Sequence, residues 1–189
     1  MTLQTFEEKL KTALLATAPP LNQSYTQAAV LLAFVLKNQV PHLIFTRRTM
    51  TVATHKGQIS FPGGVMDASD QSLTETAIRE ANEEIGLHPQ NVRVAGYLDG
   101  MRTVTDFWIT PVVAIVGEPF EYRPAITEVA EIFEVPLDEL HHLENWELGE
   151  REYNGVRYQD CRFVYRHHSI WGATGKLTFA LMNRLGKII

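Results

Sequence analysis

A helical pattern near the middle of the chain constrains the fold more than any other feature. Ser72 and Glu75 have the spacing of a capping box, and Gly86 is a natural residue just beyond a helix end. Apolar residues recur at every fourth position between them, at Leu73, Ala77, Ala81 and Ile85. This spacing predicts a helix from about Leu73 to Ile85 whose apolar stripe is buried.

The segment before this helix predicts a strand and a turn. The sequence GQISF, residues 57–61, is typical of a short strand. Pro62, Gly63 and Gly64 then predict a turn in which the backbone can approach a ligand without a Cβ in the way. The helix is expected to follow almost at once, so that strand, turn and helix form one unit.

Three glutamates on the predicted helix, Glu80, Glu83 and Glu84, fall within an arc of roughly 100° beside the apolar stripe. Like charges at this spacing destabilise a helix by roughly 0.2–0.5 kcal/mol per pair, and burial increases the repulsion. Mg²⁺ or Mn²⁺ would relieve it and keep coordination sites for water and phosphate oxygens. Arg79 could orient one carboxylate through a two-point contact. The alternative is a solvated acidic face without a ligand.

The same stretch resembles the Nudix box, written G-x5-E-x7-R-E-U-x-E-E-x-G-U with U an aliphatic residue. Gly64 matches the first glycine. Arg79 and Glu80 match the R-E pair, and Glu83 and Glu84 match the acidic pair. The remaining matches are Ala81, Gly86 and Leu87.

One position departs from the motif. The motif's first glutamate falls on Asp70, and eight residues rather than seven separate this position from Arg79. The entry to the helix therefore carries an extra residue, and the role of Asp70 stays open.

The resemblance implies an α/β fold, the Nudix α/β/α sandwich with a mixed β-sheet between helices. It also implies an enzyme in which water attacks a nucleoside diphosphate linked to another group, while cations neutralise the diphosphate. A further carboxylate outside the box often serves as base or extra ligand. We prefer Glu131 over Glu128 for that role, and the alternative is that both are surface charges. The predicted catalytic residues are Arg79, Glu83, Glu84 and Glu131, and the predicted metal ligands are Glu80, Glu83 and Glu84.

Two other segments resemble the coenzyme A pyrophosphatases within this family. The first is LIFTRRTMTVATHKGQISFPGG, residues 43–64. Its matching residues are Thr46, Arg48, Gly57 and the FPGG sequence. An arginine of the subfamily pattern is missing, because Ala53 and Thr54 occupy its candidate positions. The second segment, IWGAT at 170–174, resembles the subfamily's IWG-x-T sequence, although a lone Trp171 is more often a core residue.

This second resemblance implies hydrolysis of coenzyme A or acyl-CoA to 3′,5′-ADP and 4′-phosphopantetheine. ADP-ribose, NADH, nucleotide sugars and dinucleotides are the alternative substrates. A non-catalytic nucleotide-binding module is the alternative from another class, but it would not need three crowded carboxylates. The residues expected to bind substrate are Arg47, Arg48, His55, Lys56, Gly63 and Gly64, although basic residues in a loop are often merely solvated.

Apolar and alternating runs predict strands on both sides of the central helix. The candidates are 29–36 and 42–47, joined by a hairpin connection at 37–41, and then 92–98, 107–116 and 128–135. Asn154 and Gly155 predict the turn of a further hairpin over 151–164. A short helix is expected at 136–140, and Thr174 is expected to cap a final helix. This order favours a mixed sheet packed between helices.

The N-terminal segment predicts an amphipathic helix. Its apolar residues at helical spacing are Phe6, Leu10, Ala13 and Leu14. Pro19 and Pro20 end it, so residues 1–20 read as a helix and linker attached to one domain that spans 1–189. A chain of 189 residues, 45% hydrophobic, is a comfortable size for one core and an uncomfortable size for two. No apolar run approaches the roughly 18 residues that span a membrane.

Charge and cysteine content limit the expected partners. A net charge of −5 argues against general nucleic-acid binding, so the expected partner is a small-molecule nucleoside diphosphate, without nucleic acid or membrane. The single Cys161 favours a reduced, cytoplasmic protein, and a homodimer stays open. Two histidine pairs, His141 with His142 and His167 with His168, lack zinc-motif spacing. Because adjacent histidines point apart on a strand, we interpret both pairs as structural or exposed.

Overall fold

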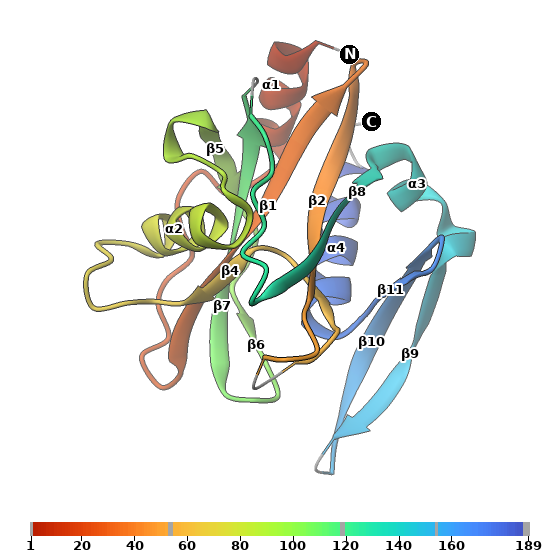
Figure 1. The fold of residues 1–189 in the computed structure, drawn as a ribbon. Coiled ribbons are helices and arrows are strands. Elements are labelled where there is room, and N and C mark those ends of the chain that lie inside the picture. Colours follow the sequence, from red (N-terminus) through yellow and green to blue (C-terminus); the bar gives the residue numbers. More distant parts are fainter. Residues whose placement is uncertain (1, 53–54, 118–119, 154, 187–189) are drawn as a thin grey trace.

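The computed structural model describes residues 2–52, 55–117, 120–153 and 155–186. Within these ranges, eight strands form one mixed sheet, in which β3, β2, β1, β7 and β5 lie in that order (Figure 1). In addition, β4 pairs with β1, β6 with β7 and β8 with β2. The strands are β1 (Thr26–Lys37), β2 (Val40–Arg48), β3 (Ile59–Ser60), β4 (Gly63–Val65), β5 (Val92–Tyr97), β6 (Met101–Arg102), β7 (Phe107–Val116) and β8 (Val129–Pro136).

A smaller antiparallel sheet lies beside the first. Its order is β11 (His168–Ile170), β10 (Val156–Tyr165) and β9 (Trp146–Tyr153). The helices are α1 (Leu3–Ala13), α2 (Leu73–Ile85), α3 (Leu137–His141) and α4 (Gly172–Leu185), with 3-10 turns η1 (Pro89–Asn91) and η2 (Leu143–Asn145). None of the helices described is long and apolar enough to cross a membrane.

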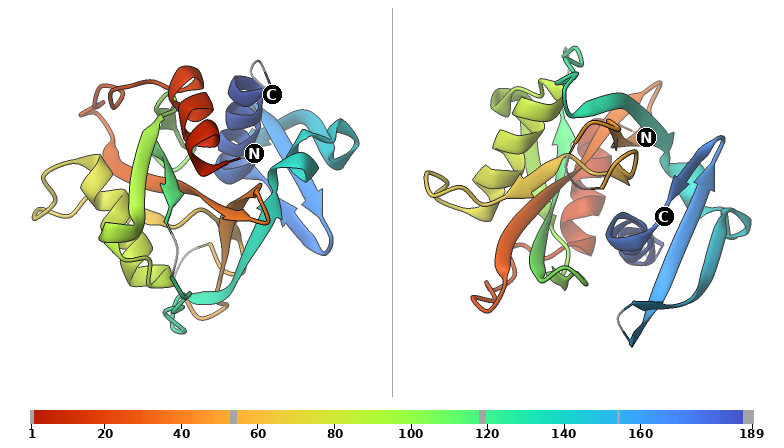
Figure 2. Two further views of the ribbon diagram at one scale, coloured as in Figure 1. Left: turned by 90° about the horizontal axis from the view of Figure 1, so that it is seen from above. Right: turned by 60° about the horizontal axis from the view of Figure 1, so that its bottom comes forward.

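Strand β1 divides the interior into two cores. Its residues alternate between the two faces of the sheet. Ala29 and Leu31 pack with the apolar stripe of α2, while Leu32 and Phe34 pack with α1 and α4. Figure 2 (left) shows α2 on one side of the sheet and α1 and α4 on the other. The predicted α/β/α sandwich is therefore confirmed, and the parallel β1–β7 pair makes the sheet mixed.

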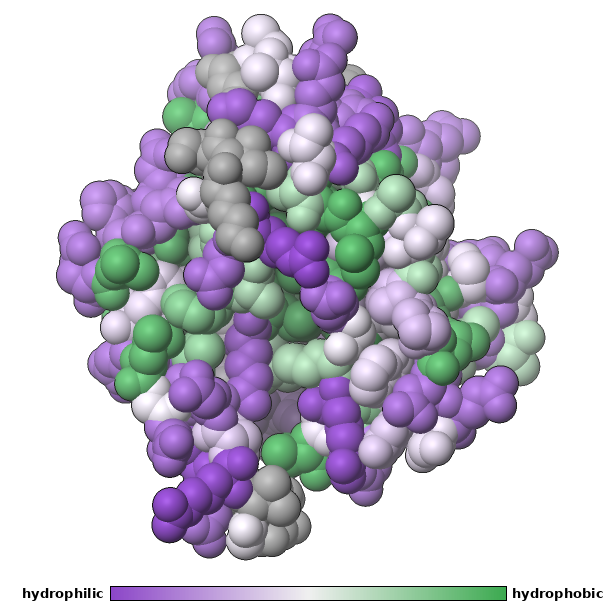
Figure 3. Space-filling view, turned by 180° about the vertical axis from the view of Figure 1, so that it is seen from behind, coloured by the Kyte–Doolittle hydropathy of each residue, from purple (hydrophilic) through white to green (hydrophobic). Residues whose placement is uncertain are grey.

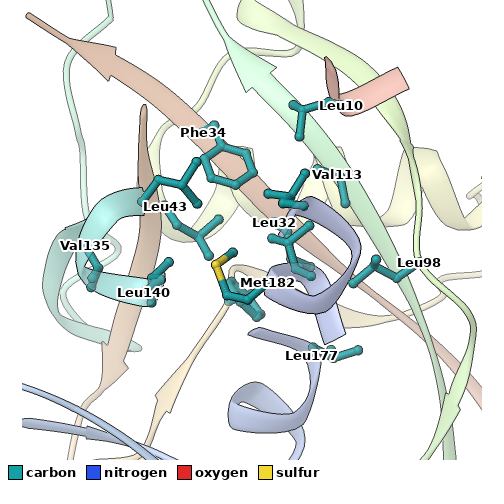
Figure 4. Close-up of a cluster of buried hydrophobic side chains, with 14 of the residues drawn as sticks. Leu10, Leu32, Phe34, Leu43, Leu98, Val113, Val135, Leu140, Leu177 and Met182 are labelled. Carbon is teal, nitrogen blue, oxygen red and sulfur yellow. The ribbon is translucent and has the colours of Figure 1, made fainter. Parts of the chain in front are cut away.

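The larger core lies under α1 and α4. Figure 4 shows Leu32 and Phe34 of β1 packed with Met182 and Leu177 of α4 and with Leu10 of α1. Leu10 and Leu32 are fully buried. On the face seen in Figure 3, hydrophobic residues lie in separate groups among hydrophilic ones, as is usual for a globular surface.

Several local predictions are confirmed. Helix α2 has the predicted ends, and the side chain of Ser72 accepts a hydrogen bond from the Glu75 backbone N–H. Gly86 closes the helix in the left-handed conformation at φ 72°. The β1–β2 connection is a tight hairpin, with Asn38 and Gln39 at φ 50° and 65°. These features depend on residues close in sequence, which explains why they could be read from the pattern.

Two local predictions are wrong. Gly63 and Gly64 do not form a turn, because they belong to β4 and pair with Val30 and Ala29 of β1. Thr174 does not cap α4, which begins at Gly172. The Thr174 hydroxyl instead donates to the carbonyl of Ile59, at 3.1 Å.

The hairpin predicted over 151–164 is present as β9 and β10, but it is longer than expected. Gly155 has φ 78°, as a tight turn requires, whereas Asn154 lies outside the described residues. Strands β6 and β11 were not predicted. Each has only two or three residues, so neither has enough sequence for an alternating pattern.

Candidate active site

Helix α2 presents its glutamates toward the end of the sheet where β2 and β4 lie. The apolar stripe packs on the sheet, and the glutamates lie at its border. Glu84 is buried, with 4% of its surface exposed. The Glu83 side chain is 58% exposed, and that of Glu80 is 18% exposed. The three carboxylates therefore run from the interior to the surface along one helix face.

Glu84 is the most constrained of the three. One carboxylate oxygen accepts from the Gly63 N–H at 3.3 Å, and the other accepts from Arg48 Nη1 at 3.4 Å. Burial raises the pKa of Glu84 to about 7, although Arg48 and the Gly63 N–H act in the opposite direction. These two long hydrogen bonds do not fully compensate for the loss of hydration on burial. The ionised carboxylate would therefore be stabilised by a further positive charge nearby.

Arg79 holds the other carboxylates of the cluster. Its Nη1 donates to Glu80 at 2.9 Å and to Glu83 at 3.1 Å. Its Nε and Nη2 each donate to one oxygen of Asp70 at 2.9 Å. The predicted orienting contact of Arg79 thus exists, but its two-point partner is Asp70. The hydrogen bonds from Arg79 hold the pKa of Asp70 well below its usual range. Burial, in contrast, raises the pKa of Glu80.

The two glycines of β4 create the space beside the carboxylates. A Cβ on Gly64 would lie 2.4 Å from the Glu80 carboxyl carbon. A Cβ on Gly63 would lie 2.3 Å from the carbonyl oxygen of Ala29. Gly64 therefore allows Glu80 to approach the backbone, and Gly63 allows β4 to pair closely with β1. Both predicted substrate-binding glycines border the glutamates.

Arg48 and Arg47 point to opposite faces of the sheet. Arg48 reaches Glu84 and also lies 3.9 Å from Glu128. The Nε atom of Arg48 is buried and has no hydrogen-bond partner among the described residues. Arg47 instead donates to Glu131 at 2.9 Å on the face that carries α4. A register shift between Arg47 and Arg48 accompanies this divergence.

The structure does not bring Glu131 to the glutamate cluster. Glu131 pairs with Arg47 in register, and Phe133, two residues on, packs in the core of the α4 face. Glu128 does lie near the cluster, since Arg48 contacts both Glu84 and Glu128, and Glu128 raises the pKa of Glu84 electrostatically. The preference for Glu131 as the extra carboxylate therefore has no support in the geometry.

His55 and Lys56 lie in the loop between β2 and β3, and both are exposed. His55 bonds with the Gln58 side chain at 2.9 Å. The loop starts beside the cluster, because the N–H of Thr49 donates to the carbonyl of Glu128 at 2.8 Å. Ala53 and Thr54, the candidate positions of the missing arginine, lie outside the described residues.

The expected pattern of the histidine pairs holds only in part. His142 is exposed, and His141 is partly buried. His167 and His168 do not point apart, because His167 lies in a turn and both rings face Glu131. Glu131, His167 and His168 could together hold a metal ion. Among the described residues, their three possible ligand atoms all lie within 4.8 Å of one another.

The α2 glutamates nevertheless suit a hard divalent cation. They supply only carboxylate oxygens, which are the ligands that Mg²⁺ and Mn²⁺ prefer. The buried Glu84, with its raised pKa, is a carboxylate that a cation would stabilise in the ionised form. Arg79 contacts Glu80, and Arg48 contacts Glu84, in each case through one carboxylate oxygen. The donor set therefore fits, and the arginines provide the contacts that orient it.

Comparison with known proteins agrees with this arrangement. A family model described as the NUDIX domain matches residues 25–154. The chain belongs to the Nudix family. It is accordingly a Nudix hydrolase, an enzyme that acts on phosphoric anhydrides, and enzymes of this family generally use divalent metal ions.

Relatives of similar length carry the Nudix hydrolase name. The chain is 36% identical over 179 residues to an uncharacterized Nudix hydrolase, NudL, from Pectobacterium atrosepticum, covering 95% of this chain and 92% of the relative. It is 37% identical over 160 residues to NudL from Citrobacter koseri, covering 85% and 83%. These relatives support the Nudix assignment across nearly the whole chain.

Solved structures share the fold. A MutT/nudix family protein from Enterococcus faecalis matches with a TM-score of 0.56 and 12% identity, covering 99% of this chain and 70% of that chain. A binary complex of a C. elegans Ap4A hydrolase matches with a TM-score of 0.51 and 14% identity, covering 60% and 82%. At these identities the likeness shows the Nudix fold alone.

Proposed function

We propose that this protein uses Mg²⁺ or Mn²⁺ to hydrolyse a nucleoside diphosphate linked to another group. The observation that carries the proposal is the buried Glu84, whose pKa is raised to about 7 beside Glu80 and the glycines of β4. Burying a poorly compensated carboxylate near other carboxylates costs free energy. A helix face that was merely solvated would not bury Glu84 in this way. A cation bound by oxygen ligands explains it, and an intact cluster favours an enzyme over a binding module.

In this proposal Glu80, Glu83 and Glu84 hold the cation. When bound, the cation would neutralise the diphosphate and lower the pKa of a water molecule. Arg79 keeps Glu80 and Glu83 in position, since one of its nitrogens contacts both. Arg48 fixes Glu84 and would be available to phosphate oxygens beside the cluster.

A carboxylate outside the helix would accept the proton of the attacking water. We assign this role to Glu128 rather than Glu131, because Arg48 connects Glu128 to the cluster. Glu131 lies on the other face with Arg47. A proton acceptor must come within hydrogen-bond reach of the water, directly or through one further water. Glu128→Gln should therefore reduce kcat more than Glu131→Gln does.

Coenzyme A is the substrate that we favour. The two segments that resemble coenzyme A pyrophosphatases are in contact, through the hydrogen bond from Thr174 to Ile59. His55 and Lys56 lie in the loop that begins at the cluster, where they could meet the additional phosphate of coenzyme A. ADP-ribose, NADH, nucleotide sugars and dinucleotides are the alternatives. The products of coenzyme A would be 3′,5′-ADP and 4′-phosphopantetheine.

The central test measures turnover of coenzyme A with Mn²⁺, with Mg²⁺ and with excess EDTA. Glu83→Gln and Glu84→Gln should each lower kcat by roughly 100-fold or more while the circular dichroism spectrum is retained. Glu8→Gln, on the exposed side of α1, is the matched control and should keep full activity. Full turnover in EDTA, or by both cluster variants, would show that the metal assignment is wrong.

A further inference from the structure

Glu131, His167 and His168 form a second cluster, on the face of the sheet away from Glu84. The Nε2 atom of His168 lies 3.5 Å from Glu131 Oε1, and the Nε2 atom of His167 lies 4.0 Å from the same oxygen. Both histidines therefore direct the same ring nitrogen toward one carboxylate oxygen. Two imidazoles and a carboxylate are a donor set that differs from the all-oxygen set of α2.

The chain reaches this geometry through a turn between β10 and β11. Arg166 adopts φ 56°, which reverses the chain immediately before the two histidines. His167 stays in the turn, and His168 is the first residue of β11. The two rings lie with their centroids 3.9 Å apart. Adjacent residues on one strand would point to opposite faces, so the turn is what brings the rings together.

The spacing suits a tetrahedral metal ion. Zn²⁺ bonds imidazole nitrogen and carboxylate oxygen at about 2.0–2.2 Å, so its neighbouring ligand atoms lie roughly 3.3–3.5 Å apart. The observed separations of 3.5 and 4.0 Å need only a small rotation of the exposed His167 side chain. Three protein ligands would leave one coordination position for water.

Neighbouring residues hold two of the three ligands in place. Arg47 binds Oε2 of Glu131 at 2.9 Å, which leaves Oε1 to face the histidines. The ring of His168 is buried and stacks on Phe133 with centroids 3.7 Å apart. Contacts of this kind orient metal ligands in known sites. Only His167, whose side chain is 76% exposed, has freedom to move.

We propose that Glu131, His167 and His168 bind a divalent transition-metal ion such as Zn²⁺, at a site separate from the α2 glutamates. Imidazole nitrogens favour Zn²⁺ over Mg²⁺, which prefers oxygen ligands. Glu131 belongs to β8 of the large sheet, whereas His168 begins β11 of the small sheet and His167 lies in the turn before it. The bound ion links the two sheets and so stabilises the folded chain, because it binds the folded form in preference to the unfolded one.

The test uses Zn²⁺ itself, in competition with a chromophoric chelator and in the presence of excess Mg²⁺ to occupy the glutamates. The wild-type protein should bind one Zn²⁺ per chain, and Zn²⁺ should raise its Tm. His167→Ala removes an exposed ligand without opening the core, and should weaken Zn²⁺ binding by about tenfold or more and abolish the Tm increase. Co²⁺ should show the visible absorption of a tetrahedral site in the wild type and not in His167→Ala.

His142→Ala is the matched control, because it also removes a largely exposed histidine from an adjacent pair. It should bind Zn²⁺ as the wild type does. Glu131→Gln provides a second variant of the site and should also weaken binding. Equal Zn²⁺ affinity in wild type and His167→Ala overturns the proposal. So does a Zn²⁺ signal that disappears in Glu83→Gln and persists in His167→Ala, which would place the ion on α2.

Discussion

Arg79 and Asp70 meet in a two-point ion pair, with Nε on one carboxylate oxygen and Nη2 on the other, each at 2.9 Å. Asp70 also accepts from the Thr76 hydroxyl and from the Asp67 N–H, both at 2.9 Å. The extra residue between Asp70 and Arg79 therefore does not prevent their contact. Asp70 fixes the arginine that in turn holds Glu80 and Glu83.

Asp70→Asn should lower the free energy of unfolding at pH 7 by about 1.5–3 kcal/mol, because it removes charged hydrogen bonds of a nearly buried group. The pKa of Asp70 is lowered by Arg79, so its stabilisation is present above the ordinary aspartate pKa of about 3.9 and declines below it. Urea unfolding between pH 3 and 7 measures the difference.

The control for this variant is Asp67→Asn. Asp67 is exposed and bonds mainly within its own turn, to Ser69. It should change stability by less than about 0.5 kcal/mol. An Asp70→Asn protein as stable as the wild type at pH 7 would contradict the assigned role. The variant should also lose activity, since Arg79 would no longer be held.

Glu84→Gln should make the metal-free protein more stable at pH 8. The pKa of Glu84 is raised to about 7 by burial, so folding takes up a proton between the ordinary glutamate pKa and pH 7. The unfolded state then binds fewer protons, and stability falls as pH rises through this window. Glutamine stays neutral, so the variant should gain about 1–3 kcal/mol at pH 8 relative to wild type and little at pH 4.5.

Thermal unfolding in EDTA across pH 4.5–8 measures this difference. Glu83→Gln is the matched control. The Glu83 side chain is 58% exposed, so replacing it with a neutral residue removes no buried charge. Added Mg²⁺ should reverse the order and stabilise the wild type more than Glu84→Gln. A wild-type protein whose stability in EDTA rises steadily to pH 8 relative to Glu84→Gln would contradict the buried, poorly compensated state of Glu84.

The features that could be predicted from the sequence are those determined by residues close together in the chain. Helix α2 follows from its cap, its stripe and Gly86, all within a short stretch. The strand identity of Gly63 could not be read, because it depends on pairing with Val30 of β1. Thr174 was misread as a cap since its partner, Ile59, lies 115 residues away.

In the candidate site, too, the features set by local sequence were predicted and those set by long-range contacts were not. Glu80, Glu83 and Glu84 share a helix face, so spacing alone placed them together. The choice between Glu128 and Glu131 depends on long-range pairing, because Glu128 lies in the turn before β8 whereas Glu131 lies in β8 opposite Arg47 of β2. No local pattern carries that information.

The two glycines of β4 should respond differently to alanine. In Gly63→Ala the new Cβ would meet the Ala29 carbonyl, and backbone cannot move aside cheaply, so the variant should lose several kcal/mol or fail to fold. In Gly64→Ala the atoms nearest to the new Cβ would be those of the Glu80 carboxylate, at the end of a side chain that can rotate away. Gly64→Ala should therefore stay folded and lose activity, since Glu80, which we propose as a metal ligand, is displaced.

Thermal unfolding and turnover, measured on both variants, separate the two effects. Gly149→Ala serves as the control, because a Cβ there would meet nothing within 4 Å. If Gly64→Ala kept full kcat, the position of Glu80 in this structure would not matter for the reaction. Conversely, wild-type stability of Gly63→Ala would contradict the close pairing of β4 with β1.

Helix α1 should be an integral part of the folded domain. Phe6 is fully buried and packs edge to face on Phe34, with ring centroids 5.1 Å apart. Phe6→Ala should lower the free energy of unfolding by about 3–5 kcal/mol, and the chain should still unfold in one transition. Gln4→Ala, on the exposed side of the helix, is the control. A separate, early transition for α1 would contradict a single domain over 1–189.

The last prediction concerns the additional 3′-phosphate of coenzyme A. A charge-assisted contact to a phosphate contributes roughly 1.5–3 kcal/mol, which is about 10-fold or more in kcat/KM. The subfamily's arginine is replaced by Ala53 or Thr54, and Arg47 is engaged by Glu131. We therefore expect coenzyme A to exceed dephospho-coenzyme A by much less than tenfold, with Lys56 providing the remaining preference.

The measurement is kcat/KM with Mn²⁺ for coenzyme A, dephospho-coenzyme A, ADP-ribose, NADH and a diadenosine polyphosphate, with products resolved by chromatography. Lys56→Ala should bring the first two substrates to equality, because Lys56 is exposed in the loop that begins at the cluster. Lys11→Ala, an exposed lysine of α1, should leave the ratio unchanged. Much faster turnover of ADP-ribose than of coenzyme A would exclude coenzyme A as the preferred substrate, while the metal-dependent hydrolysis would stand.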